Sequence, residues 1–111
     1  MGPFSVDSIR YLLYCLVKGL QALHMNSILH RDIKSDNVFI KSDGGVKLAD
    51  LGLSVFLTQE ERTRTTKCGT INWMSPELID GQPYSKSVDI WAVGITAYEF
   101  ANLMPPFMSG N

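Results

Sequence analysis

Hydrophobic side chains near the start of the chain recur at intervals of three and four residues. Between residues 5 and 25 they form one broad apolar stripe, a pattern typical of an amphipathic α-helix. Ser5 is a residue type that caps helix N-termini, and Asp7 would favour the positive end of the helix dipole. Asn26 is suited to end the helix. We therefore predict a helix over residues 5–25.

Two short apolar segments follow at the spacing of a β-hairpin. Residues 38–40 form an apolar run, and residues 46–49 alternate between apolar and polar side chains. Residues 41–45 between them are rich in Gly, Ser and Asp, which favour turns. We predict a hairpin over residues 38–49, with its first strand buried.

The second half of the chain contains a long stretch without hydrophobic period, followed by two helical signals. Residues 54–74 are rich in Thr, Arg and Glu, and a loop of this length inside a compact domain is usually functional. Ser75-Pro76-Glu77 places a proline in the first turn of a short helix, which Gly81 would end. Residues 87–102 are apolar on almost every side, which predicts a helix buried in the middle of a larger core.

Composition and charge narrow the class of protein. The 111 residues correspond to one domain or a part of one, and 10 basic against 11 acidic residues give a net charge of −1. This balance argues against a protein that binds nucleic acid or an anionic membrane through bulk charge. The longest apolar runs, residues 11–17 and 90–98, are far shorter than the roughly 20 residues that span a bilayer.

Cysteine usage and the N-terminus favour a protein of the cell interior. Cys15 and Cys68 lie far apart and form no CxxC pair, so a disulfide scaffold is not indicated. No secretory leader is visible at the start of the sequence. We therefore expect a cytoplasmic protein that is not secreted.

Four polar residues occur in an order that suits phosphoryl transfer. Asp32 could accept the proton of an attacking hydroxyl, and Lys34 could neutralise charge on the transferred group. Asn37 and Asp50 supply the hard oxygens that Mg²⁺ prefers when it is shared with nucleotide phosphates. Each alone would more often be a turn or surface residue. Together they predict a catalytic site for phosphoryl transfer.

These residues lie in motifs that together resemble a eukaryotic protein kinase domain over nearly all of the chain. Residues 30–37 resemble the catalytic loop, and Asp50-Leu51-Gly52 resembles the magnesium-binding triplet, with Leu in place of Phe. Ser75-Pro76-Glu77 resembles the triplet that ends the activation segment (50–77), with Ser in place of Ala. The helix over about 87–102 resembles the central helix of the large lobe. The resemblance implies an α+β, protein kinase-like fold, a mainly α-helical large lobe with a short β-hairpin.

Finer features resemble the Ser/Thr class of protein kinases. Lys34 follows Asp32 by two residues, where tyrosine kinases typically differ, and residues 69–74 resemble the segment Gly-Thr-x-x-Trp-Met. Residues 34–37 and 57–61 are similar to PAK-like kinases of the sterile-twenty group. The resemblance implies transfer of the ATP γ-phosphoryl group to Ser or Thr hydroxyls of protein substrates.

The same resemblance implies a phosphorylation site in the activation segment. Thr66 matches the phosphorylated position of PAK-like kinases, and Arg31 would bind the added phosphate in a bidentate manner. An activating kinase is therefore an expected partner. Three further threonines lie close enough in sequence to be alternative sites: Thr63, Thr65 and Thr70.

Other residues would bind the protein substrate. By resemblance, Thr70 would hydrogen-bond Asp32 and Lys34 from the substrate-docking loop. Asp36 and Glu99 match positions that favour basic residues upstream of the target Ser or Thr. The resemblance therefore implies protein substrates, with a preference for upstream basic residues left open.

By the same resemblance, five residues would shape the nucleotide site and its support. Phe39 would lie under the adenine ring and also belong to the core. His30 and Leu51 would belong to the stack of side chains that aligns the active lobe. Asp89 would accept backbone N–H bonds from the His30-Arg31 turn, and Glu77 would pair with an arginine later in the domain.

Some parts of a kinase domain have no counterpart in the sequence. We find no Gly-rich loop, no small-lobe lysine with its glutamate partner, and no helices after Asn111. We therefore expect part of a kinase domain that is inactive alone and belongs to an active kinase. The alternative is a non-catalytic, kinase-derived piece that binds substrates or regulators. A small GTPase could act through regions outside this chain.

Overall fold

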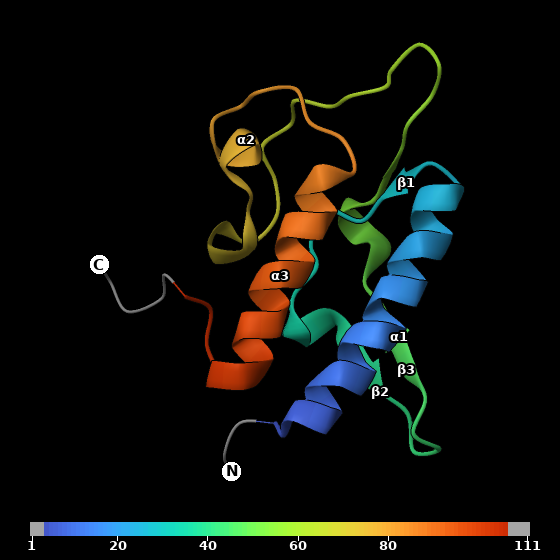
Figure 1. The fold of residues 1–111 in the computed structure, drawn as a ribbon. Helices are drawn as coiled ribbons and strands as arrows, with labels where there is room; N and C mark the ends of the chain where they lie inside the picture. The colour runs from blue at the N-terminus through green and yellow to red at the C-terminus, as the bar shows by residue number, and fades with distance from the viewer. Residues whose placement is uncertain (1–3, 107–111) are drawn as a thin grey trace.

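The computed structural model describes residues 4–106, and two long helices dominate it. Helix α1 covers Val6–Met25 and helix α3 covers Ser87–Asn102, as predicted from the hydrophobic pattern. Figure 1 shows the two helices side by side, with the short helix α2 (Pro76–Ile79) beyond the start of α3. The remaining elements are two small sheets and three single 3₁₀ turns: Ser35–Asn37, Leu51–Leu53 and Ile71–Trp73. The α+β class predicted from the sequence is confirmed.

The start of α1 has the predicted cap. The Ser5 Oγ accepts a hydrogen bond from the Ser8 N–H, which satisfies one of the free donors of the first turn. One face of the helix is buried through Leu12, Leu16 and Leu20. This face packs against α3 and the β-hairpin, so α1 is the support on which both lie.

Residues 28–56 form two antiparallel strand pairs. Strand β2 (Val38–Ile40) pairs with β3 (Val46–Leu48), which confirms the predicted hairpin. Strand β1 (Ile28–Leu29) pairs with β4 (Val55–Phe56), a contact that the sequence pattern did not indicate. The second pair brings the start of the activation segment back beside the end of α1.

The prediction that the first hairpin strand is buried is wrong. Phe39 is 51% exposed and Ile40 is 60% exposed, so Phe39 is not a core residue either. Side chains alternate between the two faces of a strand, so Val38 packs on the cluster formed with α1 while Phe39 faces away from it. Ile40 shares the face of Val38 but is not part of that cluster and is largely exposed. The other face of β2 has no cover among the described residues.

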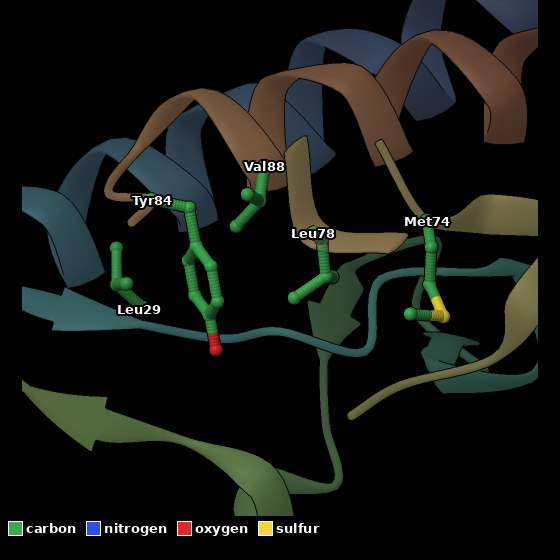
Figure 2. Packing of buried hydrophobic residues seen from close by; sticks show 5 residues of the cluster. All are labelled: Leu29, Met74, Leu78, Tyr84 and Val88. Carbon is green, nitrogen blue, oxygen red and sulfur yellow. The ribbon is translucent and has the colours of Figure 1, made fainter. Parts of the chain in front are cut away.

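The buried hydrophobic residues form two clusters that meet along residues 29–33. Figure 2 shows the first, in which side chains from β1, α2, α3 and the loops between them converge: Leu29, Met74, Leu78, Tyr84 and Val88. The second contains Leu16, Leu20, Ile33 and Ala92. Leu29 lies in one cluster and Ile33 in the other, and both are almost fully buried. Residues 29–33 are therefore held at both ends by packing.

Within residues 4–106, helix α3 is buried along one side only, and its burial in the middle of a larger core stays a prediction. Its buried positions recur at helical spacing: Val88, Asp89, Ala92, Ile95, Thr96 and Phe100. Between them, Ile90 is 59% exposed and Tyr98 is 45% exposed. Hydrophobicity alone did not separate these two sides of the helix, because apolar residues occupy both.

The long segment after β4 is largely irregular, as predicted. Arg64 and Tyr84 exchange backbone hydrogen bonds of 2.9 and 2.8 Å, which ties this segment to the loop before α3. Gly81 follows α2 with φ of 72°, a left-handed conformation that glycine adopts without strain. Among the described helices, none combines the length and apolarity that a membrane crossing needs.

Candidate active site

A buried carboxylate fixes the turn that leads into the catalytic loop. Asp89 on α3 is fully buried, and its two oxygens accept the backbone N–H groups of His30 and Arg31, each at 2.9 Å. The Asp89 Oδ2 also lies 2.8 Å from the Nε2 of His24 on α1. Three donors offset the cost of burying the charge. The backbone contacts match the prediction, whereas nothing in the sequence pattern indicated the contact with His24.

His30 connects the catalytic loop to the residue before Asp50. Its Nδ1 accepts the Asp32 backbone N–H at 3.1 Å, so its Nε2 carries the hydrogen and donates to the Ala49 carbonyl at 2.8 Å. The Ala49 N–H in turn donates to the Asn37 carbonyl at 2.8 Å. Asp50 is thereby anchored next to the loop that carries Asp32, although the two are far apart in sequence.

The Asp32 carboxylate has partners on both sides. The Thr70 hydroxyl donates to Asp32 Oδ1 at 2.8 Å, as expected from the sequence. The Asn37 Nδ2 donates to the Asp32 carbonyl at 2.7 Å and lies 3.5 Å from Asp32 Oδ2. Because the Asn37 nitrogen is used in this way, its Oδ1 is the atom left as an acceptor.

Gly69 allows Thr70 to reach Asp32. It has φ of 109°, and a Cβ at this position would stand 2.7 Å from the Arg31 carbonyl oxygen. Only glycine permits both this backbone conformation and this close approach. The segment that carries Gly69 and Thr70 therefore passes directly over the Arg31–Asp32 backbone.

Asp50 and Lys34 complete the set of predicted catalytic residues. Asp50 has φ of 56°, is exposed, and accepts the Gly52 N–H through Oδ1 at 3.3 Å. The Lys34 Nζ lies 6.0 Å from the centre of the Trp73 ring, where a cation is attracted by the ring face. The Thr70 hydroxyl bonds Asp32, and the predicted contact between Thr70 and Lys34 stays a prediction.

Arg31 is held by the activation segment through a tyrosine that the sequence analysis missed. Its Nε donates to the Leu53 carbonyl at 2.7 Å, and its Nη1 donates to the Tyr84 hydroxyl at 3.0 Å. The Tyr84 hydroxyl donates to the Thr66 carbonyl at 2.6 Å. Burial raises the pKa of Tyr84 above its usual value. The hydrogen bond and the charge of Arg31 act in the opposite direction but do not cancel this rise. The phenol therefore stays a donor to Thr66.

The other predicted site residues lie around this centre. Glu99 on α3 accepts hydrogen bonds from Ser35 and Trp73. Asp36 is exposed, and its carboxylate has no hydrogen bond or ion pair within residues 4–106. Leu51 is 54% exposed beside α1 and β3, and its role in a stack with His30 stays a prediction.

Glu77 has a local partner, while its expected pairing with an arginine later in the domain stays a prediction. The Ser87 hydroxyl donates to Glu77 Oε2 at 2.9 Å. The pKa of the Glu77 carboxyl is lowered below its usual value of 4.5. The main cause is a hydrogen bond from the backbone N–H of Glu77, and the bond from the Ser87 hydroxyl adds to it. The contact joins α2 to the start of α3.

The donor atoms fit magnesium that is shared with phosphate oxygens. Asp50 and Asn37 provide oxygen ligands of the type Mg²⁺ prefers, and Mg²⁺ in nucleotide sites needs only one or two such protein ligands. Across residues 4–106, no group of three or more His, Cys, Asp and Glu side chains is arranged to hold a metal by itself.

Comparison with known proteins identifies the family. A model of the protein kinase domain matches residues 1–111. The chain belongs to the protein kinase domain family. Among similar proteins, the serine/threonine-protein kinase pakB of Dictyostelium discoideum is 50% identical over 101 residues, 91% of this chain and 12% of the relative. The serine/threonine-protein kinase pakC of the same organism is 47% identical over 104 residues, 94% of this chain and 22% of the relative.

The similarity extends beyond these two kinases. The serine/threonine-protein kinase PAK 1 of Mus musculus is 44% identical over 97 residues, 87% of this kinase chain and 18% of the relative. The chain thus spans between 12% and 22% of the length of these three relatives. The resemblance to Ser/Thr kinases of the PAK type, inferred from the motifs, is confirmed.

Proposed function

We propose that this kinase chain supplies the catalytic centre that transfers the γ-phosphoryl group of ATP to Ser or Thr hydroxyls of proteins. The observation that carries the proposal is the 2.8 Å hydrogen bond from the Thr70 hydroxyl to Asp32 Oδ1. A hydroxyl on the docking loop already donates to the carboxylate that would accept the proton of a substrate hydroxyl. A substrate side chain approaching the same oxygen would be oriented in the same manner.

Each residue of the centre has a separate task in this proposal. Asp32 accepts the substrate proton and aligns the attacking oxygen, and Asn37 holds Asp32 through its carbonyl. Lys34 lies on the same loop and stabilises negative charge on the transferred group. The His30 ring keeps the Asp32 backbone and the Asp50 segment together.

ATP and Mg²⁺ are the cofactors in this proposal. Asp50 and the Asn37 Oδ1 would hold the metal, which neutralises phosphate charge when bound. Phe39, half exposed on β2, offers an apolar surface for the adenine ring. The half-exposed position of Phe39 is consistent with a contact surface, although it excludes the residue from the core.

Regulation through Thr66 also belongs to the proposal. Thr66 is exposed, and its carbonyl is joined to Arg31 through Tyr84. A phosphate on Thr66 would bring roughly −1.5 to −2 charges next to this guanidinium, which is suited to bind it. An activating kinase is the implied partner, and a small GTPase would act through other regions. Both cysteines are free, which fits a reduced intracellular location.

The test is a chimera, because the chain spans a minor part of its relatives. Residues 4–106 replace the matching segment of Dictyostelium pakB, the 50% identical relative. The chimera is incubated with ATP, Mg²⁺ and a Ser peptide, and the variant Asp32→Asn is assayed beside it. We expect transfer that Asp32→Asn lowers by at least about 100-fold, since general base and orientation are both lost.

Two results would overturn the catalytic proposal. One is a folded, Thr66-phosphorylated chimera that transfers no phosphate. The other is transfer that Asp32→Asn leaves unchanged. Either result would favour the alternative, a kinase-derived segment that binds proteins without catalysis. The chain alone is expected to show little transfer, and Asp32-dependent transfer by the chain alone would contradict this part.

A further inference from the structure

The β2–β3 hairpin connects the two residues expected to hold the metal. Asn37 directly precedes β2, and Asp50 follows β3 after one residue, Ala49. The Ala49 N–H donates to the Asn37 carbonyl at 2.8 Å, which closes the base of the hairpin. Residues 37–49 therefore form one unit, and Phe39 lies on the face of this unit that is turned away from the core.

The base of the hairpin is packed firmly on helix α1, which runs beside it in Figure 1. Val38 and Leu48 are a cross-strand pair at the base, and both pack on buried leucines of α1. A Cβ at Gly19 would stand 3.8 Å from the Leu48 Cβ, so helix and strand are in contact there. The next pair on the same face, Ile40 and Val46, lies nearer the turn and is not part of the cluster.

Two clefts separate the outer half of the hairpin from α1. A cleft of about 400 Å³ lies towards the start of the helix, where Leu12 and Ile40 are among its lining residues. A second cleft of about 550 Å³ lies further along the helix, between Gly19 and Lys47 among others. Val46 lines both clefts. Side-chain packing therefore does little to hold the outer half of the hairpin on the helix.

The Tyr11 hydroxyl links this outer half to α1. It donates to the Gly44 carbonyl in the turn at 2.8 Å, and within residues 4–106 it is the hydrogen bond that joins the turn to the helix. The turn itself is well ordered: the Gly44 N–H donates to the Lys41 carbonyl at 3.0 Å, and the Lys41 N–H donates to the Gly45 carbonyl at 2.6 Å. A bond to the Gly44 carbonyl thus acts on the hairpin as a whole.

We propose that Tyr11 is a positioning residue for the nucleotide, because its bond to Gly44 sets the tilt of the hairpin and with it the place of Phe39. The proposal rests on the kinase function proposed above and deepens it. The hairpin is fixed by packing at its base and by one hydroxyl at its turn. Phe39, the surface offered to the adenine ring, lies between these two attachments.

The reacting groups are separated from this link. Asn37 and Asp50 lie at the closed base, and Asp32 and Lys34 precede the hairpin in the chain. Without the Tyr11 bond the hairpin would populate several tilts, and the apparent affinity for the nucleotide falls with the fraction in the competent one. One ordinary hydrogen bond corresponds to roughly a fivefold change in such a population.

The first test follows the hairpin in the 111-residue chain and needs no activity. The Gly45 nitrogen belongs to the same peptide unit as the Gly44 carbonyl, so its ¹⁵N signal reports the bond from Tyr11. We expect Tyr11→Phe to shift this signal and to speed the exchange of the Lys41 N–H with solvent roughly fivefold. Tyr14→Phe, on the same helix with its ring 63% exposed, is the matched control and should change neither quantity.

The second test measures nucleotide binding and transfer separately in the pakB chimera. Binding of ATP with Mg²⁺ is titrated in the Asp32→Asn background, and steady-state rates are measured with Asp32 present. We expect Tyr11→Phe to raise both the Kd and the KM for ATP about fivefold, and to leave kcat and the KM for the peptide unchanged. A merely structural loss would instead lower kcat by reducing the amount of folded enzyme. Tyr14→Phe should match the chimera in all four quantities.

The outcomes distinguish this inference from the function on which it rests. An unmoved Gly45 signal in Tyr11→Phe overturns the link between α1 and the hairpin. A shifted signal with unchanged affinity for ATP, or a fall in kcat alone, overturns the role of Tyr11 in nucleotide binding. A chimera that transfers no phosphate, yet binds ATP more weakly in Tyr11→Phe, refutes the catalytic proposal and supports the role of Tyr11.

Discussion

The His24 Nε2 on the last turn of α1 lies 2.8 Å from the Asp89 Oδ2 on the first turn of α3. The same carboxylate holds the backbone N–H groups of His30 and Arg31. One buried side chain thus joins both long helices to the start of the catalytic loop. Asp89 therefore couples the position of Asp32 to the packing of the two helices, together with the buried Leu29 and Ile33.

Removing the imidazole should destabilise the fold. His24→Ala leaves the buried Asp89 carboxylate with two donors instead of three, and we expect a loss of about 1–3 kcal/mol in the free energy of unfolding. His24→Gln, whose amide can donate, should lose less. Urea unfolding followed by circular dichroism measures the difference. Gln21→Ala, an exposed change on the same helix, is the control, and an equal loss in it would contradict the prediction.

The Tyr84 hydroxyl should contribute to the stability of the fold and should also limit the motion of the activation segment. Tyr84→Phe keeps the packing of the ring in its cluster but removes bonds to Arg31 and Thr66. We expect a loss of about 1–3 kcal/mol, because one partner is charged. Trypsin should also cleave faster at the basic residues of the segment, Arg62, Arg64 and Lys67. In Tyr14→Phe, where the ring is 63% exposed, neither quantity should change.

Replacing glycine by alanine should have opposite effects on stability at Gly69 and at Gly94. In Gly69→Ala the new Cβ would stand 2.7 Å from the Arg31 carbonyl oxygen, and the alanine would have to adopt φ of 109°. We therefore expect the free energy of unfolding to fall by roughly 1–3 kcal/mol and the Thr70–Asp32 hydrogen bond to be lost. Gly94→Ala lies inside α3 with open space around the new Cβ. It should stabilise the chain by about 0.5–1 kcal/mol. Parallel urea melts test both, and a stabilising Gly69→Ala would refute the close approach.

Because the pKa of Glu77 is lowered in the fold, we expect the free energy of unfolding to decrease slightly at acidic pH. Its pKa is lowered in the fold below 4.5, so the unfolded chain binds more protons as the pH falls. The stabilisation is complete above about pH 4.5 and disappears as the pH falls through the folded pKa. Its size is limited because the side chain is partly exposed and screened by solvent.

Urea midpoints of the native chain and Glu77→Gln, measured from about pH 6 to about pH 3, test this dependence. The variant should show the smaller decrease towards acid, and Glu60→Gln should match the native chain. Parallel decreases in the native chain and in Glu77→Gln would show that the folded pKa of Glu77 is not lowered.

The sequence by itself determined the two long helices, the hairpin and the family, because these depend on local periods and on motifs with fixed spacing. Residues 5–25 carry their helix in the spacing of their leucines. Asp32 and Asn37 are recognisable from the sequence because Asn37 follows Asp32 by only five positions, so the local chain keeps the two side chains close together. Asp89 was also predictable, since a buried charge in a nearly apolar helix needs donors, and the family resemblance indicated which ones.

Only the tertiary structure decided which apolar residues are buried and which polar residues meet. Phe39 and Val38 are both apolar neighbours in one strand, yet only the face towards α1 is covered. His24 and Tyr84 have no local sign of their partners, which lie 65 and 53 residues away. Their roles follow from the packing of helices and loops, because distances between such remote residues are set by the whole core and not by their neighbours in the chain.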